Sequence, residues 1–313
     1  MKNEMNMETS AMTIRNFKEL VSHLSGLTKR CRVIVVCGSD ESTQYAVEKA
    51  VSIGFAEATF VGCREEVEAN AQLMALRPLV HIVDAEDRDD AARKAIALIH
   101  EGKGDVMMKG LINSDNLLHA ILNKETGLLP QGRVLTHIAV AEIPTYPKLL
   151  FFTDAAVIPY PTQEQRVEQV RYMSTICHSF GIAEPKMTLI HCTEKVNGRL
   201  FPFTEGYEAI KEQARQGSFG RCVVDGPFDV KVACDVHSMH VKGIESPIGG
   251  EADALIFPDI ESGNLFYKTL TLFCGATASC ILQGTVIPVS LPSRSDSPQS
   301  KFYSLAFAVI SSL

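Results

Sequence analysis

Hydrophobic residues along the chain follow two alternating patterns. Short apolar runs, beginning with Cys31–Cys37, are separated by segments such as Ser42–Ser52 whose apolar residues recur every three or four positions. Apolar strands with amphipathic helices between them are typical of a parallel sheet covered on both faces. The pattern predicts strands at 31–37, 58–61, 80–83, 105–108, 186–190, 221–224, 254–257 and 286–291, and helices at 42–52, 89–101, 115–122, 162–180, 205–216, near 263–272 and at the C-terminus.

Length and composition place this pattern in a globular protein. The 313 residues are enough for two domains, and 46% hydrophobic with 21% charged residues is ordinary for a chain with a large core. There is no low-complexity linker and no repeat of fixed period. Any boundary between domains is therefore a short crossing, which we expect near Phe152 and again near Leu282.

Charge argues against polyanionic partners. Thirty Lys and Arg face thirty-seven Asp and Glu, which gives a net charge of −7, and no basic run is long enough to bind nucleic acid or an anionic membrane. The N-terminal residues have no apolar signal region, and no stretch approaches the ~20 apolar residues that span a bilayer. We therefore expect a small-molecule partner, no nucleic acid and no membrane.

Nine cysteines, an odd number without a CxxC pair, lie mostly in apolar stretches. We expect reduced, buried thiols in a cytoplasmic protein. His237 and His240 share a helix face near Cys234 and Asp235, and could be imagined as metal ligands. Because no further ligands stand at a recognised spacing, a structural or solvent-exposed role is favoured and no metal is expected.

The common cofactor and nucleophile motifs are missing from the sequence. It contains no GxGxxG, no Walker A motif, no GxSxG and no HExxH. The missing motifs argue against four classes of enzyme: those that bind dinucleotides, nucleoside triphosphatases, serine hydrolases with a nucleophile elbow, and zinc proteases.

Polar residues follow two of the expected strands. Lys109-Gly110 comes after 105–108, and Asp225 comes after 221–224, at the edge where open α/β sheets build ligand crevices. An Asp-Gly turn is the alternative explanation for Asp225. Asn264 and Lys268 are expected at the start of a helix, where unpaired N–H groups favour an anion.

The segment Ser293–Ser297 connects the last expected strand to the terminal helix. Pro298 is favoured at the first helical position, so Ser297 is the expected N-cap. The loop before it carries Arg294, Asp296 and several hydroxyls, which suits a phosphate or a developing oxyanion. A capped helix with a surface Arg–Asp pair is the alternative.

Several motifs, in order along nearly the whole chain, resemble the phosphate acetyltransferase and phosphate butyryltransferase family. Leu-Asn-Lys-Glu and Ser-Arg-x-Asp-Ser look more like the butyryl branch. The motifs are Met107-Met108-Lys109-Gly110-Leu111, Leu122-Asn123-Lys124-Glu125-Thr126-Gly127-Leu128, Val223-Val224-Asp225-Gly226-Pro227, Pro258-Asp259-Ile260-Glu261-Ser262-Gly263-Asn264-Leu265-Phe266-Tyr267-Lys268 and Ser293-Arg294-Ser295-Asp296-Ser297.

The resemblance implies an enzyme for reversible acyl transfer: acyl-CoA plus phosphate gives acyl phosphate plus coenzyme A. A butyryltransferase is favoured, with an acetyltransferase as the alternative. It also implies two three-layer α/β/α domains with mostly parallel sheets and the active site in the cleft between them. The first domain is expected to comprise 1–152 and the returning segment 282–313, and the second 153–281. A homodimer or higher homo-oligomer is implied, with no tightly bound cofactor, no metal, and coenzyme A as a substrate.

Site residues follow by position. The family's serine is a donor to the tetrahedral intermediate and its arginine a phosphate or coenzyme A contact, and these fall on Ser293 and Arg294. The expected catalytic residues are Ser293, Arg294 and Asp296, and the expected substrate-binding residues are Lys109, Gly110, Thr136, His137, Asp225, Asn264 and Lys268.

Two positions depart from the family pattern. His119 stands where an arginine is usual, and Ser300 stands where the acetyl branch keeps a catalytic aspartate. Asp296 is the substitute candidate for the general base. Proton transfer from a thiol of pKa ~8.5 to an ordinary aspartate of pKa ~3.9 is uphill by roughly 6 kcal/mol, so Asp296 needs desolvation or must act only in the transition state.

Two other classes of function remain open. An oxidoreductase could use the same architecture, and a non-catalytic protein that binds coenzyme A would explain His119 and Ser300. The acyl group is also open, because each methylene is worth only ~1–3 kcal/mol in a pocket.

Overall fold

The structure, a computed structural model, describes residues 13–292 and 296–313. Its strands are β1 Cys31–Val36, β2 Ala56–Gly62, β3 Val80–Asp84, β4 Val106–Lys109, β5 Thr136–Glu142, β6 Leu150–Thr153, β7 Lys186–Ile190, β8 Val223–Phe228, β9 Ala254–Ile256, β10 Thr277–Gln283 and β11 Val289–Ser290. The helices are α1 Phe17–Ser25, α2 Glu41–Ile53, α3 Arg64–Glu68, α4 Ala71–Ala75, α5 Arg88–His100, α6 Ser114–Ile121, α7 Gln163–Ser179, α8 Tyr207–Arg215, α9 Val230–Cys234, α10 Val236–Val241, α11 Ile260–Phe273 and α12 Pro298–Ile310, with a 3-10 turn at Pro202–Thr204.

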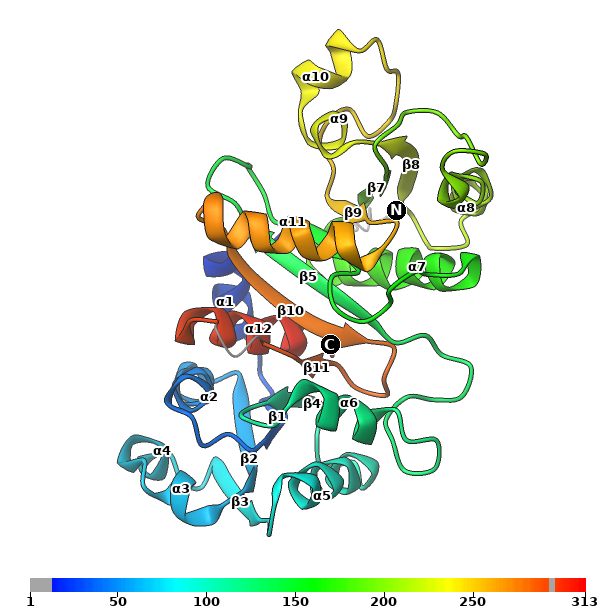
Figure 1. The fold of residues 1–313 in the computed structure, drawn as a ribbon. Coiled ribbons are helices and arrows are strands. Elements are labelled where there is room, and N and C mark those ends of the chain that lie inside the picture. Colours follow the sequence, from blue (N-terminus) through cyan, green and yellow to red (C-terminus); the bar gives the residue numbers. More distant parts are fainter. Residues whose placement is uncertain (1–12, 293–295) are drawn as a thin grey trace, which may run out of the picture.

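The strands form a single sheet of eleven in the order β3-β2-β1-β4-β11-β10-β5-β6-β9-β7-β8, with helices on both faces (Figure 1). Seven of its ten pairings are parallel. The other three, β11 with β10, β10 with β5, and β5 with β6, are antiparallel and lie together in the middle. The expected α/β class with a mostly parallel sheet is confirmed.

The middle of the sheet is the part that the periodicity did not predict. β5, β6 and β10 were not expected as strands, and β11 spans two residues where six were expected. β5 and β10 pair over seven residues although they are about 140 positions apart in the sequence. Because β5 and β6 follow one another without a helix, they break the strand–helix alternation on which the expectation rested.

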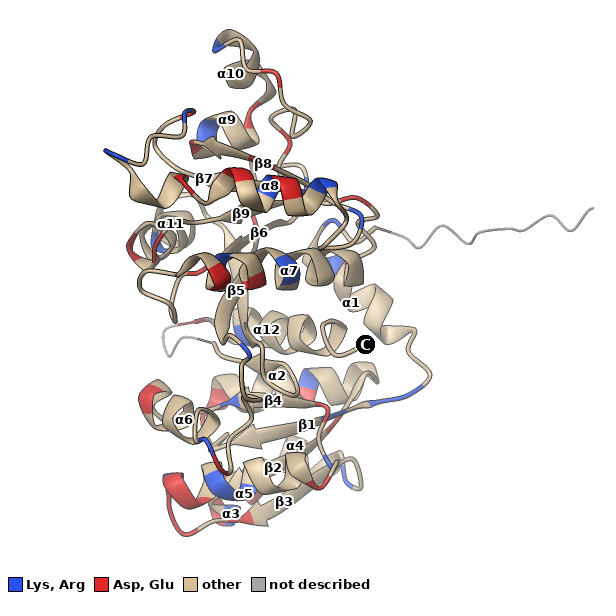
Figure 2. Ribbon diagram, turned by 90° about the vertical axis from the view of Figure 1, so that its right-hand side faces the viewer, with Lys and Arg blue, Asp and Glu red and all other residues tan. Residues whose placement is uncertain are grey.

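Helix α12 lies against the centre of the sheet. Its residues from Phe302 to Ile310 are buried apart from Tyr303, and its ribbon is mostly uncharged in Figure 2. The charged exception is Lys301, which is 5% exposed and donates to an Asp40 oxygen over 2.7 Å. Burial opposes ionisation of Asp40, but hydrogen bonds from Lys301 and Thr43 outweigh it and lower its pKa. The pair joins α12 to the start of α2.

The two-domain division remains a prediction. β11 pairs with β4, and the C-terminal helix contributes to the same apolar core as α1 and α2. The expected crossing points, Phe152 and Leu282, lie inside β6 and β10. The sheet continues through both points without interruption.

The thiols are less uniformly buried than expected. All nine cysteines are free thiols, and Cys31, Cys177 and Cys280 are buried, but Cys192 and Cys274 are exposed. The expectation of buried thiols is therefore wrong for these last two. Among the described helices, none has the length and apolar character needed to cross a membrane.

Candidate functional site

The turn after β4 begins the candidate site. Lys109 ends the strand, is 1% exposed, and its ammonium donates to the Gly110 carbonyl oxygen over 3.3 Å. A Cβ added at Gly110 would lie 2.2 Å from the Cys37 carbonyl oxygen. Only glycine allows this close approach of the turn to the end of β1, so Gly110 fixes where the buried cation of Lys109 sits.

The pKa of the Cys280 thiol on β10 is affected by several charged groups near the site. Its thiol donates to the Leu291 carbonyl oxygen over 3.1 Å. Burial raises the pKa of this thiol, the Asp296 carboxylate raises it further, and the ammonium groups of Lys268 and Lys109 act in the opposite direction. Residues from β4, α11 and the start of α12 are therefore close enough to act on one sulfur atom, although they are up to 187 positions apart.

His137 is a neutral group in the same neighbourhood. It lies opposite Leu282 of β10 and is 5% exposed. Burial lowers its pKa, the Asp154 carboxylate opposes that effect, and Lys268 lowers the pKa further. Its Nδ1 is buried without a hydrogen-bond partner among the described residues. The imidazole therefore offers an uncharged polar edge beside a cation.

Asp296 and Lys268 open onto a hollow of about 450 Å³. Helix α11 forms one side of it, the start of β10 another, and the beginning of α12 a third. Its lining residues are Tyr267, Lys268, Thr271, Leu272, Ala276, Ala278, Asp296, Ser297 and Ser300. A carboxylate, a cation and four residues with hydroxyl groups thus border space that a ligand could fill.

The start of α12 agrees with the expected cap. Pro298 is the first helical residue, and the Ser297 side chain accepts a hydrogen bond from the Ser300 N–H over 3.1 Å. Ser300, at the place of the acetyl branch's aspartate, is therefore in the first turn. Ser293 and Arg294 lie outside the described residues. Asp296 is just inside them.

The expectation for α11 needs correction. This helix begins at Ile260, and Asp259 caps it by accepting from the Ser262 N–H over 2.7 Å. Asn264 and Lys268 therefore lie in later turns, where backbone N–H groups are already used within the helix. The Asn264 amide donates to the Ala155 carbonyl oxygen over 2.9 Å. Asn264 holds the helix in place, and Lys268 acts through its side chain.

Thr136 belongs to a buried network around Asp154. Its hydroxyl donates to an Asp154 oxygen over 2.8 Å, and the His137 N–H donates to the same oxygen over 3.0 Å. Backbone N–H groups of residues 156, 157 and 158 also donate to this carboxylate. Asp154 is 2% exposed. Sequence reasoning missed it, because the strand before it, β6, was not predicted and Asp154 was therefore not recognised as a strand-end residue.

Asp225 lies far from these residues. It is inside β8, not after a strand end as expected, and β8 is the sheet edge seven positions from β4. At about 4.8 Å per strand the separation along the sheet is roughly 30 Å. Asp225 accepts from the Ser246 hydroxyl over 2.6 Å and pairs with Lys211 at 3.5 Å. The structure does not bring it to the site.

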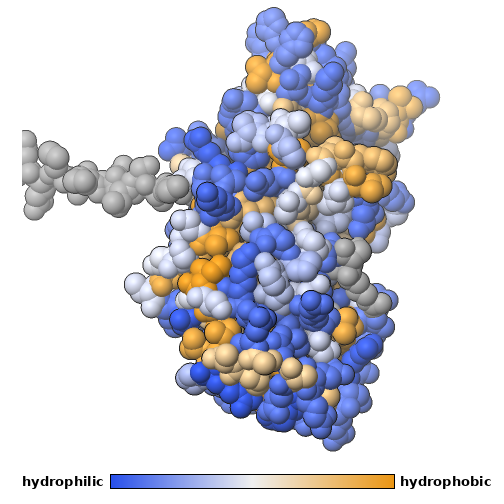
Figure 3. Space-filling view, turned by 90° about the vertical axis from the view of Figure 1, so that its left-hand side faces the viewer, coloured by the Kyte–Doolittle hydropathy of each residue, from blue (hydrophilic) through white to orange (hydrophobic). Residues whose placement is uncertain are grey.

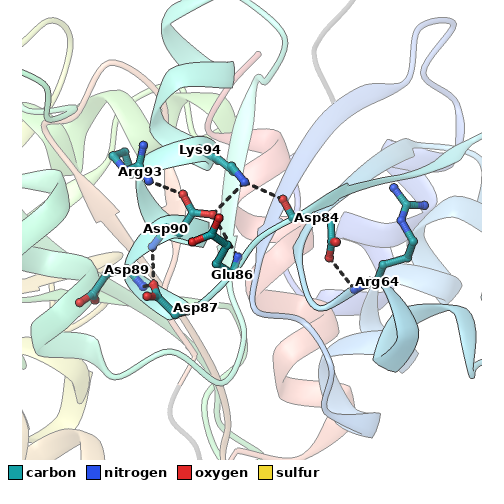
Figure 4. A network of polar contacts seen from close by, with 8 residues as sticks. All are labelled: Arg64, Asp84, Glu86, Asp87, Asp89, Asp90, Arg93 and Lys94. Carbon is teal, nitrogen blue, oxygen red and sulfur yellow. Dashed lines mark hydrogen bonds and ion pairs between the residues drawn. The ribbon is translucent and has the colours of Figure 1, made fainter.

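Acidic residues between β3 and α5 form a second polar group (Figure 4). Asp87 caps α5, and Asp90 pairs with Lys94 at 2.8 Å and with Arg93. Lys94 also donates to the Asp84 carbonyl oxygen. These contacts stabilise the start of α5, so the group has a structural explanation. Within residues 13–292 and 296–313, no cluster of three or more His, Cys, Asp or Glu could hold a metal ion.

His119 faces outward on α6. It borders a shallow hollow between α5 and α6 with Asp89, Asp115 and Asn116. The acidic surroundings do not suit an anion. The replacement of the family's usual arginine therefore lies outside the group around Cys280.

Comparisons with known proteins are consistent over most of the chain. Residues 82–309 match the family described as "Phosphate acetyl/butaryl transferase". The chain is 34% identical over 298 residues to the phosphate butyryltransferase of Clostridium acetobutylicum, covering 95% of this chain and 98% of that protein. It is 30% identical over 294 residues to the phosphate acetyltransferase of Thermotoga maritima, covering 94% and 98%.

Solved structures give the same fold. A branched-chain phosphotransacylase from Enterococcus faecalis V583 superposes with a TM-score of 0.78 at 29% identity, covering 90% of this chain and 99% of that one. A 4-hydroxythreonine-4-phosphate dehydrogenase from Klebsiella pneumoniae superposes with a TM-score of 0.54 at 11% identity, covering 91% and 100%, and shares the fold alone. The architecture therefore does not decide the chemistry, and the side chains around Cys280 must.

Proposed function

The chain belongs to the phosphate acetyl/butyryltransferase family, and we propose that it is a phosphate butyryltransferase that moves a butyryl group between coenzyme A and phosphate. Membership makes it a phosphate acyltransferase. The choice of butyryl over acetyl is supported by the Leu-Asn-Lys-Glu and Ser-Arg-x-Asp-Ser motifs. The observation that carries the site is the hollow that Lys268 and Asp296 line together; the charges of both residues and of Lys109 also act on the pKa of Cys280.

Cations supply the phosphate site in this proposal. Lys109 and Lys268 belong to β4 and α11. Arg294, which lies outside the described residues, is assigned as a further cation whose guanidinium matches two phosphate oxygens. Ser293 donates to the oxyanion of the tetrahedral intermediate, where one well-placed donor is commonly worth ~3 kcal/mol. His137 remains neutral and does not compete with these cations for the anion.

The proton passes through Asp296. In the direction that makes acyl-CoA, the thiol of coenzyme A gives its proton to the Asp296 carboxylate as sulfur attacks the carbonyl carbon of the acyl phosphate. The intermediate then breaks its carbon–oxygen bond to phosphate, which leaves. In the other direction phosphate attacks the thioester, and protonated Asp296 returns its proton to the departing thiolate. In either direction the proton moves between sulfur and Asp296 only while the sulfur–carbon bond forms or breaks. The full cost of ~6 kcal/mol for making a free thiolate is therefore not incurred.

The remaining residues divide by their contacts. Gly110 and His137 border the substrates, whereas Thr136 and Asn264 position the elements that carry the site. Asp225, at the far sheet edge, is left outside it. Coenzyme A and phosphate are substrates, and the mechanism requires no tightly bound cofactor. A cytoplasmic location is part of the proposal, supported by nine thiols without a disulfide.

Purified protein with phosphate and acyl-CoAs of increasing chain length provides the test, with free thiol release as the signal. We expect release that is fastest with butyryl-CoA. Faster release with acetyl-CoA would assign the chain to the acetyl branch. Binding of coenzyme A without release from any thioester would make it a non-catalytic binding protein and would overturn the proposal.

A second copy of the chain is the proposed partner of α11. Leu265 and Phe273 are 69% and 79% exposed, and apolar surface gathers in the upper right of Figure 3. Soluble monomers rarely expose large contiguous apolar patches, and the family resemblance implies a homodimer. We expect twice the mass of one chain by light scattering, and a single-chain mass for Phe273→Lys. Leu200→Lys, at another exposed leucine, is the matched control. A single-chain mass for the unaltered protein would remove the dimer.

A further inference from the structure

The hollow beside Asp296 and Lys268 has polar residues in one part of its lining and apolar residues in another. The carboxylate, the ammonium and the hydroxyls of Ser297 and Ser300 come from the start of α12 and the middle of α11. Tyr267 and Thr271 of α11 also line the hollow. The apolar part of the lining is Leu272 from the end of α11, Ala276 just before β10 and Ala278 within it. A ligand that fills this space therefore has a polar part and a short apolar part.

The apolar part begins directly beside the charged groups. Leu272 follows Lys268 by four residues, which is one helical turn or about 6 Å along α11. Ala278 precedes Cys280 by two residues, so the two side chains point to the same face of β10 about 7 Å apart. Cys280 is the thiol on which Asp296, Lys268 and Lys109 act. The apolar lining thus leads away from the group of charges where the acyl carbon would react.

Small side chains keep this space open. Ala278 is 3% exposed, and Ala276 is half-buried just before the strand. A larger residue at either position would fill volume that is now part of the hollow. Leu272 also lines the hollow and is 72% exposed, so the hollow is open to solvent at this residue.

We propose that Ala276, Ala278 and Leu272 form the acyl-chain site and set the length of chain that the enzyme accepts. The inference rests on the proposed acyl transfer. Burying each added methylene against this lining stabilises a butyryl group relative to an acetyl group, by an amount that corresponds to about 10- to 200-fold per methylene. The residues determine specificity and take no part in the chemical step.

Ala276→Leu tests the proposal, because its position is only half-buried and tolerates a larger side chain. We expect kcat/KM for butyryl-CoA to fall by at least ~10-fold relative to acetyl-CoA, with kcat for acetyl-CoA retained. Leu272→Ala should act in the opposite direction and raise turnover of five- and six-carbon acyl-CoAs relative to butyryl-CoA. Ala278→Ser adds only one oxygen atom and provides a second, milder narrowing at the buried position.

Thr277→Leu is the matched control. Thr277 lies between the two alanines, and strand alternation turns its side chain to the other face of β10. It should leave the ratio of butyryl to acetyl turnover unchanged. Circular dichroism melts of every variant separate loss of folding from loss of specificity.

Two results would overturn the inference. One is an unchanged chain-length profile in folded Ala276→Leu and Leu272→Ala. The other is an equal rise in KM for coenzyme A with every acyl group, which would assign the hollow to the pantetheine arm. Absence of turnover in the unaltered protein would instead count against the proposed function, so the two failures can be told apart.

Discussion

Asp154 is a buried carboxylate, whereas Asp296 borders a hollow that a ligand could fill. Asp154 is 2% exposed and accepts the Thr136 hydroxyl and backbone N–H groups of β5 and of the turn after β6. Asp296 borders a hollow of about 450 Å³ together with Lys268. A carboxylate surrounded by donors from its own chain organises the fold, whereas one that borders open volume beside a cation can serve a ligand.

Asp296→Asn gives the largest expected effect and tests the catalytic side of this comparison. The amide cannot accept the thiol proton, so we expect kcat to fall by at least ~100-fold. The free energy of unfolding should change little. Stopped-flow or steady-state thiol assays measure the rate, and urea titration measures the stability. Turnover close to that of the unaltered protein would remove Asp296 from the mechanism.

Asp154→Asn tests the structural side. An amide keeps one accepting oxygen and turns a donor toward the donors already present, so buried N–H groups lose their partner. We expect the free energy of unfolding to fall by about 3 kcal/mol, measured by urea titration. Asp225→Asn, an aspartate at the sheet edge paired with Lys211, is the control and should lose less than half as much.

One result would contradict the structural role of Asp154: an Asp154→Asn variant that is as stable as the unaltered protein but has a kcat about 100-fold lower. Asp154 would then belong to the reaction and not to the fold.

A smaller effect concerns pH. His137 is buried and its folded-state pKa is lowered, whereas in the unfolded chain it binds a proton below about pH 6.5. The unfolded state therefore gains protons first as the pH falls, and stability contributed by neutral His137 is lost from about pH 6.5 downward, by up to about 1.4 kcal/mol per pH unit.

Urea titrations at pH 7.5 and pH 5.5 measure this loss. His137→Gln removes the titrating group and should show a smaller loss than the unaltered protein, while exposed His81→Gln should follow the unaltered protein. Equal losses in all three proteins would show that His137 is not a source of the pH dependence.

Many of the helices and strands could be predicted from the local spacing of hydrophobic residues. The strand at 186–190 was predicted with its observed bounds, and the longer helices α2, α5, α6, α7, α8 and α11 were predicted to within a few residues because amphipathic spacing is a local property. Helix α1 and the short helices α3, α4, α9 and α10 were not predicted. Ser297 and Pro298 were assigned correctly for the same reason. The α11 start was misplaced by about one turn, because Asp259 caps the helix before the segment that looked like its beginning.

The site was only partly accessible from the sequence. Lys109, Lys268 and Asp296 were selected as separate strand-end or helix-end residues, or through the family motifs, and nothing local indicated that they meet at Cys280. Thr136 and Asp225 were grouped with them, although the first is held by Asp154 and the second lies at the far sheet edge. Residue type suggests what a group can do, but its partners decide what it does.

By itself, the sequence determined the α/β class, the family and the residue types needed for acyl transfer to phosphate. The tertiary structure decided that β5 and β10 pair in the middle of the sheet, and that this pairing brings His137, Lys268 and Asp296 into one neighbourhood with Lys109. The reason is physical: hydrophobic periodicity reports which face of an element is buried, whereas the choice between distant strand partners depends on packing over the whole chain.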